Sequence, residues 1–289
     1  MAGVAPARAG RTRTRSASRG FSHAGIYAVA AVLAVLVLVP LVYVVLGGFR
    51  TTGQLAAKPV GIPQPWVTSN YRELISSGTF WRQIGNSALI AAIATTLVVA
   101  FGALAAYALS RFEFRGRESL YTLFTFGLLF PISVAILPLY LLIRQLGLLD
   151  TALGVAVPEA AFGLPLTILI LRPFMRSVPV ELEDAAAIDG CGRLGFFWRI
   201  LVPLSQPALA TVAIVAVVFS WNMFLLPLLV LNNTKEWTLP LGVAAYSTEY
   251  TQDTARILAY TALSMVPALA FFVAAERRIV GGLSGAVKG

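Results

Sequence analysis

Few residues in this sequence of 289 have side chains that commonly perform catalysis or hold a metal. A single cysteine, Cys191, cannot form an internal disulfide, and a single histidine, His23, leaves no basis for a Ser–His hydrolase or a zinc protease. The lysines, Lys58, Lys235 and Lys288, lie outside any G-x-x-x-x-G-K-S/T loop for ATP phosphates. We therefore predict no catalytic residue, no metal site and no cofactor of this chain's own, which leaves a transport or scaffold role.

Four of the 13 acidic residues lie in one segment, residues 177–190, which has the features of a short helix. Pro179 suits a first helical turn, and Asp189-Gly190 indicates the end of the helix because glycine readily adopts a positive φ. Three acids near the positive end of the helix dipole favour it further: Glu181, Glu183 and Asp184. A second helical stretch is predicted over 193–201, ending at Pro203.

Helical spacing divides this acidic segment into two faces. One face carries Leu182, Ala185, Ala186 and Asp189, and the other carries Glu181, Asp184 and Ile188. Small alanines allow close approach, and the acids offer charge pairing. Because so short a helix is marginal alone in water, it must pack on something. The sequence leaves open whether the covering surface belongs to the chain's own helices or to a partner protein.

The elements that must position this segment are membrane helices. The chain is 58% hydrophobic and only 12% charged, with a mean hydropathy of +0.80, whereas soluble domains carry about 25% charged residues. The net charge of +9 is spread between apolar runs, so we expect no nucleic-acid partner. Residues 1–25, rich in arginine and free of acids, are predicted to be a disordered basic tail.

Six apolar runs have the length of membrane-spanning helices, about 20 residues each. They lie near 26–47, 86–110, 120–143, 152–172, 206–231 and 255–275. The first run is longer than the apolar region of a signal peptide and has no good cleavage site after it, so we interpret it as a membrane helix. The predicted organisation is a six-helix domain over 26–275, followed by a C-terminal tail over 276–289.

Orientation follows from the distribution of Lys and Arg, which favours the cytoplasmic side. With the N-terminus inside, 15 of the 22 basic residues fall in inside segments and 7 in outside segments. Both termini and the loop 173–205 are therefore predicted to be cytoplasmic, and the long segment 48–85 to lie outside.

The loop resembles the EAA loop of inner-membrane permeases of bacterial ABC importers, whose pattern is E-A-A, three residues, G, nine residues, I-x-L-P. Both spacings are kept in Asp184-Ala185-Ala186, Gly190 and Ile200-x-Val202-Pro203. Asp184 replaces the family's glutamate, and Val202 replaces its leucine. Further features are similar to the smaller permease of maltose-type carbohydrate importers: Asn70-Tyr71, Asn86-Ser87, Ala161–Pro165 ahead of Leu171-Arg172, Ser220-Trp221-Asn222 with Phe224–Pro227, and the tail Gly282–Gly289.

This resemblance implies an all-α polytopic membrane protein with the type I ABC importer permease fold, in the bacterial cytoplasmic (inner) membrane. The implied partners are a homologous second permease, an ABC ATPase dimer that binds ATP and Mg, and an extracytoplasmic sugar-binding protein. The loop is then the coupling helix that docks on the ATPase. Its implied coupling residues are Glu181, Glu183, Asp184, Ala185, Ala186, Asp189, Gly190, Ile200 and Pro203.

Three polar or aromatic residues inside the apolar runs are candidates for the substrate path. A carboxylate such as that of Glu159 costs free energy when it is buried in a membrane. One prediction is that it accepts hydrogen bonds from sugar hydroxyls or acts as a gate residue. The alternative is a structural hydrogen bond to a neighbouring helix. Trp221 and Asn222 are predicted to contact sugar, or Asn222 to bond a neighbouring helix. Two alternatives for the whole chain are an ABC permease for another solute, such as a glycerol phosphodiester, and a secondary transporter that works without ATP.

Overall fold

The computed structural model describes residues 17–247 and 252–286, and within these ranges the chain is helical apart from turns, loops and an isolated bridge between Ser247 and Gln252. The elements, in chain order, are α1 (Ala17–Gly48), α2 (Thr52–Ala57), α3 (Ser69–Ser76), α4 (Gly78–Arg111), α5 (Arg117–Gly127), α6 (Ile132–Gln145), α7 (Ala152–Ser177), α8 (Glu181–Ile188), α9 (Arg193–Phe196), η1 (Phe197–Leu201), α10 (Val202–Leu204), α11 (Gln206–Trp221), α12 (Leu225–Val230), α13 (Leu239–Gly242), η2 (Val243–Tyr246) and α14 (Thr254–Ala286).

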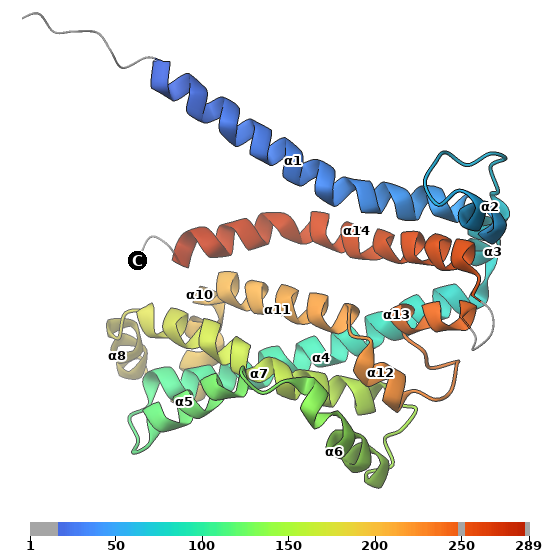
Figure 1. Cartoon of the computed structure of the whole chain (residues 1–289). Coiled ribbons are helices and arrows are strands. Elements are labelled where there is room, and N and C mark those ends of the chain that lie inside the picture. Colours follow the sequence, from blue (N-terminus) through green and yellow to red (C-terminus); the bar gives the residue numbers. More distant parts are fainter. Residues whose placement is uncertain (1–16, 248–251, 287–289) are drawn as a thin grey trace, which may run out of the picture.

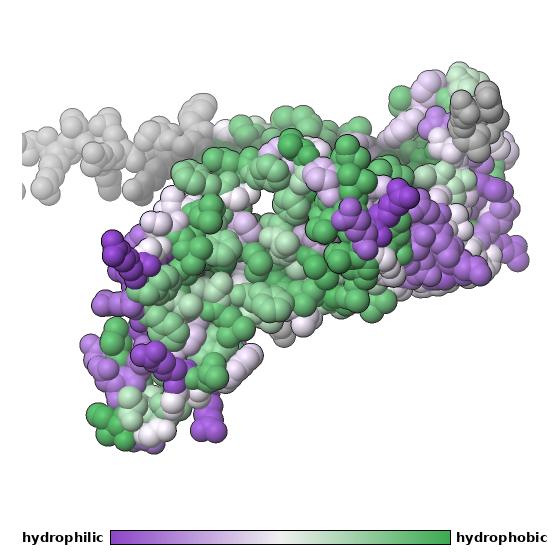
Figure 2. Space-filling model, turned by 90° about the horizontal axis from the view of Figure 1, so that it is seen from below, coloured by the Kyte–Doolittle hydropathy of each residue, from purple (hydrophilic) through white to green (hydrophobic). Residues whose placement is uncertain are grey.

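Four of the described helices are long and apolar enough to cross a membrane, namely α1, α4, α7 and α14. Two bent pairs raise the number to six if each pair forms one span: α5 with α6, and the stretch 193–204 with α11. Figure 2 shows an extensive apolar surface between hydrophilic ends, as expected of a protein embedded in a bilayer. The predicted polytopic all-α membrane fold is confirmed, and the bent pairs are compatible with six spans.

Two of the predicted spans follow a broken path. The run 120–143 is divided between α5 and α6, which meet at 97°. Pro131 stands in the break, where its missing amide hydrogen and its effect on the preceding residue disfavour a continuous helix. The run 206–231 contains α11, which ends at Trp221, and the separate short helix α12. The second bent pair joins α11 instead to the preceding stretch 193–204, at 78°, so the predicted bounds of this span were wrong. Apolar composition therefore located these segments but did not reveal their bends.

The centre of the bundle is the long packing of α4 on α7, with α11 beside them (Figure 1). Glycines permit this close approach. A Cβ placed on Gly163 would lie 2.7 Å from the Val98 Cγ2 atom, and one on Gly102 would overlap Thr167. At one end of the bundle, α4, α7 and α11 form a buried cluster with the segment after α7, and this cluster includes Tyr107 and Ala186. We call it the α8-end cluster.

The first helix stands apart from this bundle. Its apolar window is not buried within the chain, and it packs mainly along α14 (Figure 1). It begins at Ala17, so a disordered tail over the whole of 1–25 was an overestimate; residues 1–16 lie outside the described residues. Helix α14 similarly continues to Ala286, well into the predicted tail 276–289. Helices extend in this way because each added residue gains a backbone bond once the helix has formed.

The close contact between α1 and α14 at Gly48 contributes to the free energy of unfolding, and this contribution can be tested. A Cβ on Gly48 would lie 2.7 Å from the backbone Cα atom of Ala259, whereas one on Gly25, in the same helix, would meet nothing within 4 Å. We expect Gly48→Ala to lower the free energy of unfolding by about 1–3 kcal/mol through overpacking. Gly25→Ala should instead be neutral or stabilising by up to about 1 kcal/mol, because alanine favours helix. Thermal unfolding of both variants in one detergent measures the difference, and equal melting temperatures would contradict it.

Candidate functional site

The acidic segment forms the predicted helix, α8, with the predicted end. Gly190 adopts a φ of +77°. Its amide donates to the carbonyl oxygen of Ala187 at 3.0 Å, and the amide of Cys191 donates to that of Ala186 at 2.8 Å. This pair of bonds closes the helix in the manner of a Schellman motif, which requires a left-handed residue at the glycine position. The three predicted acids lie in the first turn.

Helix α8 lies at one end of the bundle, the end at which α1 begins and α14 finishes (Figure 1). Its buried side differs from the predicted alanine face. Ala186 is buried in the α8-end cluster, whereas Ala185 is exposed. The other exposed residues of α8 and its C-cap are Glu181, Leu182, Asp184, Ala187, Ile188 and Asp189. The helices that the structure describes therefore cover one narrow side of α8, and the other residues of α8 are exposed.

A buried arginine fixes α8 to the bundle. Arg111 is the last residue of α4, and its side chain is only 4% exposed. Its guanidinium donates to the carbonyl oxygens of Met175, at 2.9 Å, and Val178, at 2.6 Å, where α7 ends. The same group lies 3.7 Å from the Glu183 carboxylate of α8. Arg111 is one of the 15 basic residues predicted to lie inside, and its role in holding α8 was not predicted.

The second stretch of the loop, residues 193–204, returns the chain to α11 and is also anchored on α4. The Tyr107 hydroxyl donates to the carbonyl oxygen of Arg193 at 3.0 Å, and the Tyr107 and Phe197 rings lie 5.0 Å apart. Ile200 packs against the α8-end cluster, whereas Pro203 is exposed in the first turn of α10. Within the I-x-L-P part of the predicted pattern, Ile200 therefore packs against the protein's own helices, whereas Pro203 lies at the surface.

Large apolar side chains are exposed on this loop beside its acids. Ile188 is 86% exposed, and Leu194 and Trp198 are exposed as well. The exposed residues of the loop thus include these apolar side chains, the acids Asp184 and Asp189, and the basic residues Arg193 and Arg199. Exposed apolar groups rimmed by polar ones are typical of a site that binds another protein.

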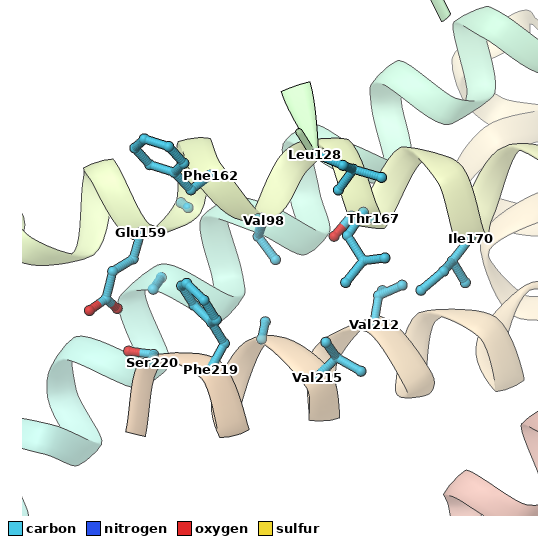
Figure 3. A pocket seen from close by; sticks show the side chains of 15 residues that line it. Val98, Leu128, Glu159, Phe162, Thr167, Ile170, Val212, Val215, Phe219 and Ser220 are labelled. Carbon is cyan, nitrogen blue, oxygen red and sulfur yellow. The ribbon is translucent and has the colours of Figure 1, made fainter. Parts of the chain in front are cut away.

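Glu159 lies in a second region, a cavity of about 210 Å³ between α4, α7 and α11 (Figure 3). The cavity walls are mostly apolar and include Phe162 and Phe219. Glu159 is 2% exposed, and neither of its carboxylate oxygens has a hydrogen-bond partner among the described residues. Ser220 of α11 faces this carboxylate, and its hydroxyl is likewise buried without a partner. Ser220 is therefore the group on a neighbouring helix that stands nearest to the geometry of the predicted structural hydrogen bond, and both predicted roles of Glu159 stay predictions.

Trp221 and Asn222 line a different cavity from Glu159. It has a volume of about 530 Å³ and lies between α1, α4, α11 and α14. The Asn222 amide donates at 2.8 Å to the carbonyl oxygen of Val218, one turn back in its own helix, rather than to a neighbouring helix. The structure thus brings Trp221 and Asn222 together but separates them from Glu159.

The protein has several long apolar helices and a short helix, α8, that is anchored at one end of the bundle and partly exposed. These features define a multi-pass membrane protein with the architecture of a transport subunit. Residues 98–278 match the family described as the inner membrane component of binding-protein-dependent transport systems. The chain belongs to this family. Members are permease subunits without an enzymatic activity of their own, and ATP hydrolysis belongs to a partner ATPase.

Relatives at the level of sequence and of fold agree with this assignment. The diacetylchitobiose uptake system permease protein NgcG of Streptomyces coelicolor is 35% identical over 252 residues, which cover 86% of this chain and 83% of that protein. The arabinooligosaccharides transport system permease protein AraQ of Halalkalibacterium halodurans is 33% identical over 264 residues, covering 90% and 94%. The solved structure of a bacterial ABC transporter involved in alginate import has a similar fold, with a TM-score of 0.78 at 22% identity over 92% of this chain and 99% of that chain.

Proposed function

We propose that this chain is a permease subunit of an ATP-driven sugar importer in the bacterial cytoplasmic membrane. The observation that carries the proposal is the family membership of a chain whose α8 is held by the bundle on one side and exposed on the other. Sugar as cargo is supported by the names of relatives more than 30% identical over most of the chain. A homologous second permease would complete the translocation pathway, and an extracytoplasmic sugar-binding protein would deliver the substrate.

In this proposal α8 is the coupling helix and docks on a dimer of ABC ATPases, which hold the ATP and Mg. The exposed acids and apolar residues of the loop would make the contact, whereas Ala186, Glu183 and Ile200 face the chain's own helices and would transmit the motion. Because α8 lies at the end where α1 begins and α14 finishes, both termini would be cytoplasmic (Figure 1). The Lys and Arg distribution supports the same orientation.

The cavity beside Glu159 is proposed to be part of the substrate path. A carboxylate that is buried without a partner is costly in a membrane and is expected to have a function. The aromatic rings of Phe162 and Phe219 could cover the C–H faces of a sugar ring. Trp221 and Asn222 remain candidates for substrate contact, but in the separate cavity next to α1 and α14.

The cargo and the energy source can be tested together by uptake in cells that carry or lack this chain. The probes are radiolabelled diacetylchitobiose, arabinobiose, trehalose and glycerophosphocholine. ATP-dependent uptake of one of the saccharides, lost with the chain, is the expected result. Uptake of glycerophosphocholine alone would favour the phosphodiester alternative. Uptake that persists after ATP depletion at constant ion gradients would favour a secondary transporter and contradict the proposal.

Cross-linking tests the docking of α8 directly. In a Cys191→Ala background we expect Ile188→Cys, a highly exposed position of α8, to cross-link an ATPase subunit in working membranes. Val60→Cys is the matched control, because Val60 is also a highly exposed aliphatic residue but lies in the segment predicted to be outside. Capture of the ATPase from position 60, or its absence from position 188 in membranes that import sugar, would contradict the proposed docking.

A further inference from the structure

We propose that Arg111 is a positioning residue for energy coupling: it ties α8 to the ends of α4 and α7, so that a displacement of α8 moves these membrane helices. The inference rests on the proposed coupling role of α8. It assigns to Arg111 the transmission of a displacement from α8 to the membrane helices α4 and α7.

The geometry places Arg111 where three helices meet. It belongs to α4, its guanidinium donates to two carbonyl oxygens at the end of α7, and it faces the Glu183 carboxylate of α8. It also lies 6.0 Å from the centre of the Phe196 ring in the second stretch of the loop. One buried, planar group at the end of α4 therefore contacts the end of α7, α8 and the second stretch of the loop.

Little else holds α8 against the bundle. Ala186 is the one residue of α8 buried in the α8-end cluster, and its methyl group is small. The side chain of Glu183 is 27% exposed, whereas the other residues in the first turn of α8, Glu181, Leu182 and Asp184, are exposed. Val178, just before α8, and Cys191, just after it, also pack on this cluster and hold the two ends of the segment. The described contacts of the helix itself with the bundle are the Ala186 methyl group and the Arg111–Glu183 ion pair, so the guanidinium of Arg111 has the main part in transmitting a displacement of α8.

A second arginine provides a matched control. Arg172 of α7 is also buried at this end of the bundle, and its guanidinium donates to the carbonyl oxygen of Leu109 at 3.1 Å. It pairs with Glu118 and lies 4.0 Å from the centre of the Tyr121 ring. These contacts join α7 to α4 and α5 but do not include α8. Loss of either arginine weakens the bundle, yet loss of Arg111 alone should disconnect α8.

The test measures the number of sugar molecules imported per ATP hydrolysed. The complete importer, with its partner ATPases, second permease and sugar-binding protein, is placed in phosphatidylethanolamine–phosphatidylglycerol vesicles with the saccharide that the wild type imports. We expect Arg111→Met to lower this ratio about tenfold, a coupling of typical size, and Arg172→Met to keep it near the wild-type value. Arg111→Lys should restore part of the ratio, because lysine keeps the charge but lacks the planar fork.

Combined variants separate positioning from loss of stability. Glu183→Gln should lower the ratio less than Arg111→Met, and adding it to Arg111→Met should have little further effect, because the two residues act through one contact. Thermal unfolding of each variant identifies any general loss of stability. A wild-type ratio in Arg111→Met, or equal ratios in Arg111→Met and Arg172→Met, would overturn the inference. If the wild-type complex itself shows no ATP-dependent uptake, the proposed function fails instead.

Discussion

Replacement of Asp184 or Gly190 by arginine is expected to abolish sugar uptake while the protein still inserts in the membrane. Asp184 is exposed in the first turn of α8, so Asp184→Arg reverses the charge of the proposed docking surface without disturbing a buried contact. It also places a cation at the positive end of the helix dipole. Gly190→Arg places a long cation at the other end of α8 and forces a side chain into a left-handed backbone conformation, which costs about 1–2 kcal/mol.

Two variants separate the charge of the arginine from the strain at Gly190. Gly192 is also exposed with open space around it, but its φ of −70° suits any residue, so Gly192→Arg adds the charge without the strain. Gly190→Ala adds the strain without the charge. Uptake of the labelled saccharide, the amount of the chain in the membrane fraction and co-purification of the ATPase are measured for all four variants. Normal uptake by both Asp184→Arg and Gly190→Arg would refute the coupling role of this loop.

Replacement of Glu159 by methionine is expected to stabilise the protein and to impair transport. The carboxylate is buried in a mostly apolar cavity without a hydrogen-bond partner among the described residues, and methionine has a similar length without the polar group. Removing an unsatisfied buried polar group should raise the free energy of unfolding by about 1–3 kcal/mol. If the carboxylate meets substrate or water when the bundle opens, uptake should fall by about tenfold, which corresponds to about 1.4 kcal/mol.

A rise in the free energy of unfolding together with a fall in uptake would show that Glu159 serves transport and does not stabilise the fold. Glu159→Gln keeps the size and the hydrogen-bonding groups and should show a smaller change in both measurements. Asn222→Leu examines the other cavity, and comparison of the two variants shows which cavity contacts substrate. Thermal unfolding and uptake are measured on the same preparations. A methionine variant that is less stable than the wild type and imports sugar normally would contradict a role of Glu159 in the path.

Much of the membrane architecture was predictable because it depends on composition. Four of the six apolar runs correspond to single long helices, and the run 120–143 was placed correctly without its bend. The bounds of the run 206–231 were wrong, because the second bent pair joins α11 to the preceding stretch 193–204 and does not include α12. The bend of 97° between α5 and α6 was not predicted, because a hydropathy pattern gives the length of an apolar segment and not its direction. The early start of α1 at Ala17 was missed since helix extension past the membrane leaves no apolar pattern.

The sequence by itself determined the existence and the end of α8, because acids in the first turn and glycine at a left-handed position act within a few bonds of one another. The start was predicted less well, since α8 begins at Glu181 and Pro179 precedes it instead of lying in its first turn. Only the tertiary structure decided which side of α8 is buried, that Arg111 holds it, and that Glu159 and Asn222 line separate cavities. Arg111 and its acceptor Met175 are 64 residues apart, so no local pattern relates them. Such contacts arise from the packing of α4 on α7, in which small residues let the helices approach until these groups meet.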